Sequence, residues 1–449
     1  MNKATYDAIE KISSDEIKAL YSIYLYRCLT YKQIFKMHFL KKFDSVTNFE
    51  DEILKKWIAL GIAKKIYFKH NNYVMFLTTR GVDILRIEYD FPSNILDSNK
   101  QVIQRGYFRA NELEMHPRLI NHQVHLNQFV LDFKRYCNVS DKEYGTNLYN
   151  KLKYFDEKHI SSHQSIRPDG LLSLMDIDFY IEMDMSTESK KQLEEKWERY
   201  RRFLLSQSTK NIQNERKIIV LFIVEKSKDL EKRKNLVKLT TSQVLLDQFD
   251  SQYFDLHVGS SKEMLNIVFN NILPSFECRS QNQNSLLSIL SKEDFLVSHG
   301  YNIKHRFENI EYDYYIRKVN KDNSLKMENK RPIEFLVDDY RDGSMCVLNR
   351  ISYHMKNNVL FKNTYGRDIP LLVIIQSLKS IMTDLELIDF NFDSNSLVYF
   401  LNLEEVQGNN IIESVFQIDG LGNIYKFKDY SLSSKIYKLN INTNSNLKI

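Results

Sequence analysis

Residues 167–200 read RPDGLLSLMDIDFYIEMDMSTESKKQLEEKWERY, and this stretch decides the fold at the centre of the chain. Two short strand-like runs, at 170–174 and 177–184, precede a run at 188–205 with the apolar spacing of a helix, which Ser186 or Thr187 can cap. A continuous apolar run at 218–224 follows, which is typical of a strand buried on both faces of a sheet. Strands, a helix and a buried strand in this order predict an α/β domain over residues 161–275.

Acidic residues stand at both of these short strands. Asp169 comes immediately before the first strand, and Glu182 and Asp184 lie at the end of the second. Because Glu182 and Asp184 are two residues apart on a strand, both side chains point to the same side. Carboxylate oxygens suit Mg²⁺ or Mn²⁺, and such an ion can activate water and stabilise charge on a phosphate. We therefore predict a metal site formed by Asp169, Glu182 and Asp184.

Lys196 lies on the helix that follows, where it flanks an apolar stripe that includes Trp197 and Tyr200. A lysine at this position can aim at the end of the sheet and pair with the carboxylates, or it can extend to solvent. In the first case Lys196 and Glu182 are the candidate catalytic residues of a metal-dependent DNA endonuclease. The alternative is that the acids are ordinary turn and strand-end residues and that Lys196 is a salt-bridge partner.

This layout resembles the PD-(D/E)xK nuclease superfamily, which includes restriction and recombination endonucleases. Pro168-Asp169 matches the first element of the superfamily's motif, and Glu182 matches the second. Asp184 stands where most members have a lysine, although some members carry that lysine on the following helix, as Lys196 does here. The resemblance implies a restriction-endonuclease-like domain that uses Mg²⁺ or Mn²⁺, and it leaves open whether this domain cleaves DNA.

Residues 1–90 show a different pattern, in which three helical runs precede two short strands. The five runs lie at 15–27, 31–39, 48–60, 63–68 and 73–77. Asn48 is the expected cap of the third helix. The order resembles the winged helix-turn-helix domains of bacterial DNA-binding proteins, as does the wording Leu-Thr-x-x-Gln-Ile that begins at Leu29. In such a domain the third helix would enter the major groove of DNA.

The charges of residues 1–90 permit contact with DNA. This segment has 15 Lys/Arg against 11 Asp/Glu, a net charge of +4. The third helix opens with the acidic residues 50–52, but basic residues follow on it and on the two strands. The candidate DNA-binding residues are Lys55, Lys56, Lys64, Lys65 and Lys69. Lysines of this kind contact phosphates and fix position rather than sequence. The alternative is a winged helix used for dimerisation or packing.

Residues 91–160 are predicted to be a helical connector. Residues 93–108 are polar and loop-like, residues 117–136 have the spacing of a long amphipathic helix, and residues 144–155 offer a strand. His122 and His125 lie on this helix without a carboxylate cluster near them in the sequence. We therefore interpret both histidines as packing or capping residues.

Residues 285–440 repeat the order of the central domain, which indicates an internal duplication. The matching runs lie at 311–316, 333–339, 345–355 and 371–376. Asp313 and Asp338 match the first two acids of the central domain, and Arg350 is the basic residue nearest to the position of its lysine. This second copy is therefore expected to be a degenerate nuclease-like domain that helps to form a groove for DNA or a partner.

A further resemblance joins the N-terminal and central regions. A winged helix followed by Arg-Pro-Asp-Gly, Glu-x-Asp-x-Ser-Thr-Glu and Lys-x-x-x-Tyr resembles the replication-relaxation family over roughly residues 10–260. The matching residues are Arg167–Gly170, Glu182, Asp184, Ser186, Thr187, Glu188, Lys196 and Tyr200. This resemblance implies a protein of plasmids or other mobile elements that is associated with DNA replication and conjugation.

Composition excludes several classes of protein. The 449 residues are 43% hydrophobic and 27% charged, with a net charge of +5, which fits a globular protein of about two to four domains. The four cysteines are scattered without metal-ligand spacing, and no apolar run is long enough for a membrane span, so a cytoplasmic protein is expected. Phosphate-binding loops, dinucleotide fingerprints and HExxH motifs are absent from the sequence.

Together these patterns predict a mixed α and α/β multidomain protein, with an N-terminal winged helix-turn-helix followed by one or two restriction-endonuclease-like domains. The expected function is binding of double-stranded DNA, at an origin, in plasmid replication or conjugative transfer. One alternative is a Mg²⁺-dependent PD-(D/E)xK endonuclease in recombination, transfer or defence. The other is a winged-helix regulator or assembly factor without catalysis. Replication or transfer proteins are the expected partners, and an oligomer is compatible with the sequence.

Overall fold

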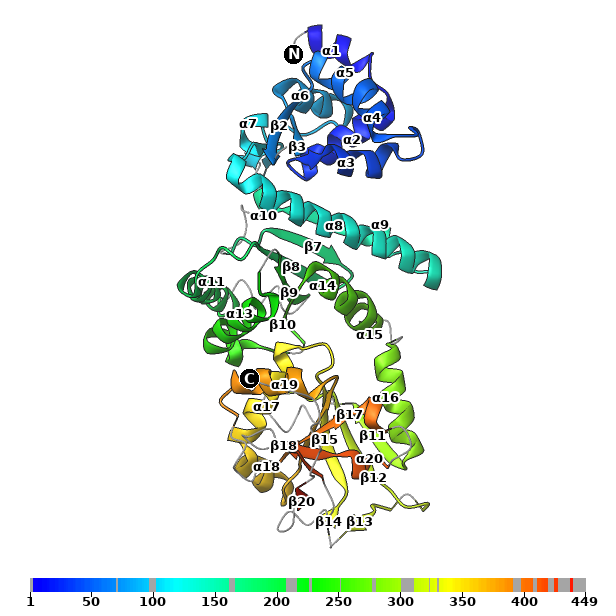
Figure 1. The fold of residues 1–449 in the computed structure, drawn as a ribbon, viewed down its shortest axis with the longest axis vertical. Coiled ribbons are helices and arrows are strands. Elements are labelled where there is room, and N and C mark those ends of the chain that lie inside the picture. The colour runs from blue at the N-terminus through cyan, green and yellow to red at the C-terminus, as the bar shows by residue number, and fades with distance from the viewer. Residues whose placement is uncertain are drawn as a thin grey trace. The chain divides into compact units, whose positions relative to one another are not determined.

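The computed structural model shows a mixed α/β protein with three main sheets (Figure 1). It describes residues 3–69, 72–96, 102–160, 166–206, 216–225, 228–250, 252–276, 280–299, 311–322, 324–328, 331–390, 397–406, 410–418, 424–426 and 437–438. The chain divides into two compact units, Met1–Met175 with Tyr180–Met183 and Asp176–Phe179 with Asp184–Ile449. The four domain ranges expected from the sequence stay predictions.

The first unit begins with a cluster of helices. In chain order they are α1 (Lys3–Ile9), α2 (Ser14–Leu25), α3 (Tyr31–Ile34) with η1 (Phe35–Phe39), and α4 (Val46–Phe49) with η2 (Glu50–Leu54) and α5 (Lys55–Ala59). Ser45, rather than Asn48, caps the helix that runs from α4 to α5. The Ser45 hydroxyl accepts the Asn48 N–H at 3.1 Å, so the helix begins earlier than predicted.

A three-stranded sheet packs against these helices, with the order β1 (Leu29–Thr30), β3 (Asn72–Leu77) and β2 (Ala63–Lys69). Strands β2 and β3 form the antiparallel hairpin that the sequence predicted. The helix α6 (Thr79–Glu88) follows. Trp57 is fully buried in this part of the unit, and its indole N–H donates to Glu16 at 3.0 Å.

The connector differs in part from the prediction. Residues 93–108 are not all loop, because β4 (Asn94–Leu96) pairs with β5 (Val102–Arg105). After α7 (Ala110–Leu113), α8 (Pro117–Tyr144) runs eight residues beyond the expected end at 136. It ends at Gly145, which adopts the left-handed conformation, and in the turn that follows the Asp141 carboxylate accepts the N–H groups of Leu148 and Tyr149 at 2.6 and 2.9 Å. The following elements are α9 (Leu148–Lys151), β6 (Lys153–Asp156) and α10 (Glu157–Ile160).

The motif-bearing strands have the predicted bounds, β7 (Gly170–Leu174) and β8 (Ile177–Asp184). They belong to a five-stranded sheet of order β10-β9-β8-β7-β6, in which β9 (Lys217–Val224) and β10 (Phe254–Gly259) are parallel. The helices are α11 (Lys190–Leu204), α13 (Leu230–Leu245) with η3 (Leu246–Gln248), α14 (Ser261–Ile267) with η4 (Val268–Ile272), and α15 (Leu273–Phe276). Helix α11 begins later than predicted, because Ser189 and Gln192 form its capping box.

An eight-stranded sheet organises the C-terminal part of the second unit. Its order is β11 (Phe295–His299), β12 (Tyr314–Lys318), β15 (Glu334–Asp339), β16 (Leu371–Ile375), β17 (Val398–Asn402), β18 (Phe416–Ile418), β19 (Ile424–Lys426) and β20 (Tyr437–Lys438). Strands β15, β16 and β17 are parallel, and the other pairs are antiparallel. A separate short ladder joins β13 (Met327–Glu328) to β14 (Arg331–Pro332).

Helices cover both faces of this sheet. They are α16 (Gln281–Lys292), α17 (Met345–Lys356), α18 (Asn358–Tyr365), α19 (Leu378–Glu386), η6 (Leu403–Val406) and α20 (Ile411–Ser414). In Figure 1, α17, α18 and α19 lie on one side of the sheet and α16 and α20 on the other. Leu286 and Leu290 of α16 share a buried cluster with Phe335 and Val337 of β15. Among the described helices, none has the length and apolarity that a membrane crossing requires.

Candidate functional site

Asp169 lies directly before β7 and is held by two groups of its own unit. Its Oδ2 accepts the backbone N–H of Met183 at 2.7 Å and lies 3.2 Å from Nε2 of His122 on α8. The same His122 nitrogen is 2.8 Å from the Met183 carbonyl oxygen. Because a carbonyl can only accept, Nε2 carries the proton and donates. His122 is therefore a site residue that the sequence reasoning treated as packing, since its neighbour Asp169 is 47 residues away.

Glu182 is buried near the end of β8, with 3% of its surface exposed. Its position on the strand agrees with the sequence prediction. A buried carboxylate needs a cation or hydrogen-bond donors to offset its lost hydration, so Glu182 retains the character of a ligand or an ion-pair partner.

Asp184, the third predicted metal ligand, is already bound by an arginine. Arg233 on α13 donates from Nε to Oδ2 at 2.6 Å and from Nη2 to Oδ1 at 3.1 Å. The Ser186 N–H donates to Oδ1 as well, at 2.8 Å. Both carboxylate oxygens are thus engaged in a buried, bidentate ion pair. The sequence offered no sign of this pair, because Arg233 is 49 residues away and on a helix with no motif.

Lys196 packs inward on α11 rather than extending to solvent, since its side chain is only 14% exposed. Its ammonium lies 3.1 Å from a carboxylate oxygen of Glu188 and 5.3 Å from the centre of the Phe222 ring. The salt-bridge role considered for Lys196 is therefore present, with Glu188 as a partner. The catalytic role of Lys196 stays a prediction.

These contacts bear on whether the predicted residues fit a divalent ion. Asp184 does not fit as a ligand, because the Arg233 guanidinium already neutralises its charge and occupies both oxygens. Asp169 and Glu182 supply the oxygen chemistry that Mg²⁺ prefers. Within the described ranges, however, no group of three or more His, Cys, Asp or Glu side chains is placed to hold a metal ion. The described residues therefore do not assemble the predicted three-carboxylate metal site.

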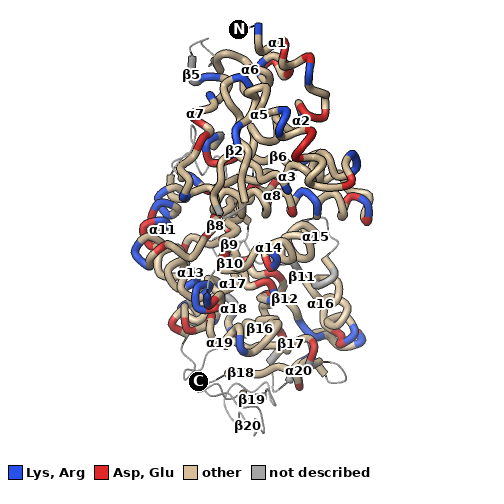
Figure 2. Tube along the Cα trace, turned by 45° about the horizontal axis from the view of Figure 1, so that its top comes forward, with Lys and Arg blue, Asp and Glu red and all other residues tan. Residues whose placement is uncertain are grey.

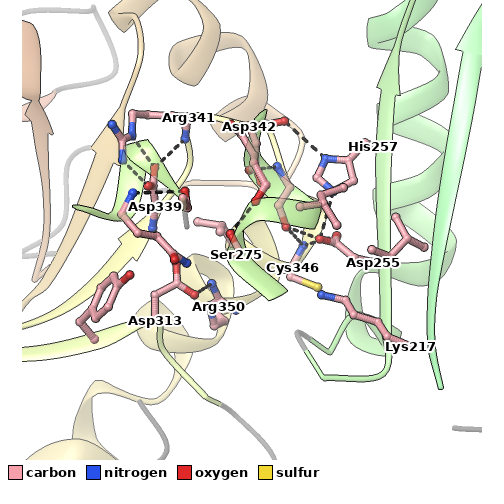
Figure 3. Close-up of a pocket in the computed structure, with 18 residues that line it drawn as sticks. Lys217, Asp255, His257, Ser275, Asp313, Asp339, Arg341, Asp342, Cys346 and Arg350 are labelled. Carbon is pink, nitrogen blue, oxygen red and sulfur yellow. Dashed lines mark hydrogen bonds and ion pairs between the residues drawn. The ribbon is translucent and has the colours of Figure 1, made fainter. Parts of the chain in front are cut away.

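A polar cavity of about 170 Å³ lies in the second unit (Figure 3). Its wall includes Asp255 and His257 of β10, whose side chains pair at 3.3 Å. Burial alone would lower the pKa of His257, but the Asp255 carboxylate reverses this effect and raises it. Asp255 also accepts the Ser344 hydroxyl at 2.7 Å and the Cys346 N–H at 3.3 Å, so it holds the start of α17. Sequence patterns gave no indication of this network.

The candidate DNA-binding lysines have different surroundings. Lys55 pairs with Asp51 at 2.7 Å, Lys56 with Glu16 at 2.6 Å, and Lys64 with Glu114 at 2.6 Å. The side chain of Lys69 lies outside the described residues. Figure 2 shows acidic and basic residues interspersed around α2 and α5.

Lys65 is placed differently from the other candidate lysines. Its ammonium lies over two aromatic rings of the hairpin, 3.7 Å from the centre of Tyr73 and 4.7 Å from that of Tyr67. Tyr73 stacks on Tyr31, with the ring centres 4.6 Å apart. Lys65 and Tyr67 are exposed, with 60% of Tyr67 accessible to solvent. The hairpin therefore carries an exposed lysine and an exposed tyrosine, Lys65 and Tyr67, beside the buried ring of Tyr73. Together with Tyr31 of α3 these residues form what we call the hairpin cluster: Tyr31, Lys65, Tyr67 and Tyr73.

Comparison with known proteins identifies a family for part of the chain. The model of the replication-relaxation family matches residues 20–219, a segment that runs from α2 to the start of β9 and spans just under half of the chain. No curated protein and no solved structure matches the chain. The matched segment contains the helical cluster except α1 and the start of α2, and it contains the hairpin, Asp169, Glu182 and Lys196. Residues 20–219 of this protein are thus similar to the replication-relaxation family.

Proposed function

We propose that this protein binds double-stranded DNA in plasmid replication, and that the hairpin formed by β2 and β3 is its main DNA contact. The family of residues 20–219 indicates an association with plasmid replication. Replication or transfer proteins of the same element are the proposed partners. The fold supports the proposal because three helices followed by a two-stranded hairpin are the elements of a winged helix-turn-helix domain.

The helix that runs from α4 to α5 is the counterpart of a groove-reading helix, but its charges oppose this use. Asp51 and Glu52 are exposed on it, and phosphates would repel both. Glu50 accepts the hydroxyl of Tyr73, so this acid is tied to the hairpin. The nearby Lys55 is paired with Asp51. This helix therefore contributes less to phosphate attraction than the sequence suggested.

The hairpin cluster carries the proposal. Among the described carboxylates none pairs with Lys65, so its charge is available to a phosphate. The rings of Tyr67 and Tyr73 hold the ammonium at the surface without neutralising it. Tyr67 offers an exposed ring and hydroxyl beside it, which suits contact with sugar and backbone. The proposal therefore takes the lysine and tyrosine rings of the β2–β3 hairpin as the wing contact with the DNA backbone.

Duplex binding measured against salt tests this proposal. Fluorescence anisotropy of the full chain with plasmid-derived duplexes should show affinity that falls steeply with salt. Lys65→Ala should flatten the slope of log K against log salt by about 0.9, the value for one lost phosphate contact. Lys55→Ala is the matched control, because Lys55 is exposed on the helix but paired with Asp51, and it should change the slope little. A larger effect of Lys55→Ala than of Lys65→Ala would refute the hairpin assignment.

A second candidate function, a Mg²⁺- or Mn²⁺-dependent endonuclease, rests on Asp169 before β7 and the buried Glu182 on β8. When bound, the ion would supply water activation and charge stabilisation at a phosphate. His122 orients the Asp169 carboxylate, and Lys196 is held on α11 by Glu188. The test is nicking of supercoiled plasmid in Mg²⁺ or Mn²⁺. Nicking that is lost in Glu182→Gln would support this candidate, and nicking unaffected by that change would exclude the assigned site.

A further inference from the structure

Two pairs of acids, Asp169 with Glu182 and Asp313 with Asp338, show the same kind of backbone-to-side-chain hydrogen bond. Asp169 stands one residue before β7, and its carboxylate accepts the N–H of Met183, the residue after Glu182. Asp313 stands one residue before β12, and its carboxylate accepts the N–H of Asp339, the residue after Asp338, at 2.9 Å. This places Asp313 and Asp338 at the positions that Asp169 and Glu182 hold in the central part.

The surrounding elements repeat in the same order. The strand order β6-β7-β8-β9-β10 has its counterpart in β11-β12-β15-β16-β17. The first pair is antiparallel and the last pair parallel in both series. A helix follows the acid-bearing strand in each, α11 after β8 and α17 after β15. The equivalence of the two centres therefore rests on topology as well as on the hydrogen bond.

The C-terminal centre contains an internal cation. Arg350, on α17, donates from Nε to Asp338 Oδ2 at 2.9 Å. It also donates from Nη2 to Asp313 Oδ1 at 3.0 Å (Figure 3). The Asp313 N–H also donates to Asp338 Oδ1, at 3.1 Å. Asp338 is fully buried and Arg350 is 5% exposed. Burial alone would lower the pKa of Arg350, but the two carboxylates raise it, so the guanidinium stays charged.

Two carboxylates in such a setting require a positive charge between them, because like charges in a buried site repel strongly. In a metal centre a divalent ion meets this requirement and keeps coordination positions for water and phosphate. A guanidinium meets it through fixed N–H groups and leaves no such position. We propose that Arg350 has taken the place of a divalent cation at the Asp313–Asp338 centre, which makes the C-terminal copy a closed, non-catalytic relic of a metal site.

The surroundings of Arg350 hold its helix in place, while the Asp313 side chain is 33% exposed and lines the polar cavity beside Arg350. Asp255 of β10 caps the start of α17 through Ser344 and Cys346, so the helix that carries Arg350 is fixed in place. Arg341 lies beside the Asp313–Asp338 centre and pairs with Asp339 (Figure 3). Both residues of this second ion pair line the cavity. Asp313 and Asp338 thus have Arg350 as their partner, and Asp339 has Arg341.

The test is whether a divalent ion can replace the arginine. The parent protein is the full chain with Glu182→Gln, a change that weakens any Mn²⁺ binding at Asp169 and Glu182. Electron paramagnetic resonance measures bound Mn²⁺, and thermal unfolding measures stability with and without Mn²⁺. The parent should bind no Mn²⁺ at the C-terminal centre. Arg350→Ala should unfold at lower temperature, gain a Mn²⁺ site and recover stability when Mn²⁺ is added.

Two further variants locate the acquired ion and control for a failure to fold. Asp313→Asn in the Arg350→Ala protein should remove the acquired Mn²⁺ site, which locates the ion at this centre. Arg350→Gln removes the positive charge but keeps a polar side chain of intermediate length, and it should admit Mn²⁺ if Arg350→Ala does not fold. A folded Arg350→Ala or Arg350→Gln protein with no Mn²⁺ binding beyond the parent would overturn the proposal, as would a parent protein that binds Mn²⁺ through Asp313.

Discussion

Replacing Arg233 with methionine tests the ion pair that closes Asp184. Methionine keeps much of the aliphatic stem of arginine but removes the guanidinium, so the fully buried Asp184 carboxylate would be left with the Ser186 N–H as its described donor. Breaking a buried pair by removing one partner costs about 3–5 kcal/mol, because the remaining charge stays unpaired in a poorly hydrated site. Arg233 also donates to the Glu188 carbonyl at 2.7 Å, which favours the upper part of that range.

Urea unfolding followed by tryptophan fluorescence measures this loss. The chain has two tryptophans, and Trp197 is buried in the second unit, where its N–H donates to Thr240 at 3.1 Å. A Trp57→Phe background therefore makes Trp197 the reporter of the unit that contains Arg233. The urea midpoint should fall while the slope of free energy against urea stays the same, because the surface exposed on unfolding is unchanged.

Two variants calibrate the result. Lys190→Met removes an exposed partner of Glu194 on α11 and should cost less than about 0.5 kcal/mol, as exposed helix pairs do. Asp184→Asn combined with Arg233→Met should be more stable than Arg233→Met alone, because the unpaired charge is gone. An Arg233→Met protein within about 0.5 kcal/mol of its parent would refute the claim that this pair closes the site.

Two further predictions concern other parts of the fold. The ion pair of Asp255 and His257 should give the second unit a maximum of stability against pH. Burial alone would raise the pKa of Asp255, but His257 lowers it. The stabilisation that Asp255 contributes is therefore lost as pH falls below the ordinary pKa of an aspartate, 3.8. The raised pKa of His257 means that its contribution is complete below 6.5 and is lost as pH rises through the raised value, and thermal unfolding against pH should show a flatter curve for His257→Gln. Gly81→Ala should destabilise the first unit by about 1–3 kcal/mol, because the added Cβ would stand 2.3 Å from the Ile62 carbonyl oxygen. Thermal unfolding followed by circular dichroism tests this, and an unchanged midpoint would contradict it.

Local patterns predicted the strands well and the helix starts less well. The bounds of β7 and β8 follow from alternating and continuous apolar runs, which depend only on neighbouring residues. The start of α11 was placed too early, because several residues in the run Ser186–Ser189 can cap a helix and only the fold selects Ser189. The end of α8 was placed too early, although Gly145, which adopts the left-handed conformation just past the helix, is the residue that ends it.

The candidate site shows the limit of sequence reasoning more clearly. Strand-end acids such as Asp169 and Glu182 can be located from the pattern, since strand period fixes which residues share a side. Their partners cannot, because His122 and Arg233 lie on other helices with no motif of their own. The sequence repeat placed Arg350, Asp313 and Asp338 in elements that match those of the central domain, so their proximity could be predicted. The hydrogen bonds between them are known only from the structure.

The ion pairs of Arg233 and Arg350 bear on the candidate nuclease activity but not on the proposed DNA binding. A nuclease centre needs carboxylates whose charge is neutralised by an ion that also contacts the phosphate. At Asp184 and at the Asp313–Asp338 pair the neutralising group is a guanidinium that offers no open coordination position. Any cleavage would therefore depend on Asp169 and Glu182, whereas the proposed DNA binding through Lys65 would require neither acid. Glu182→Gln should for this reason leave duplex affinity and its salt slope unchanged, and a large loss of affinity in that variant would contradict the separation of the two roles.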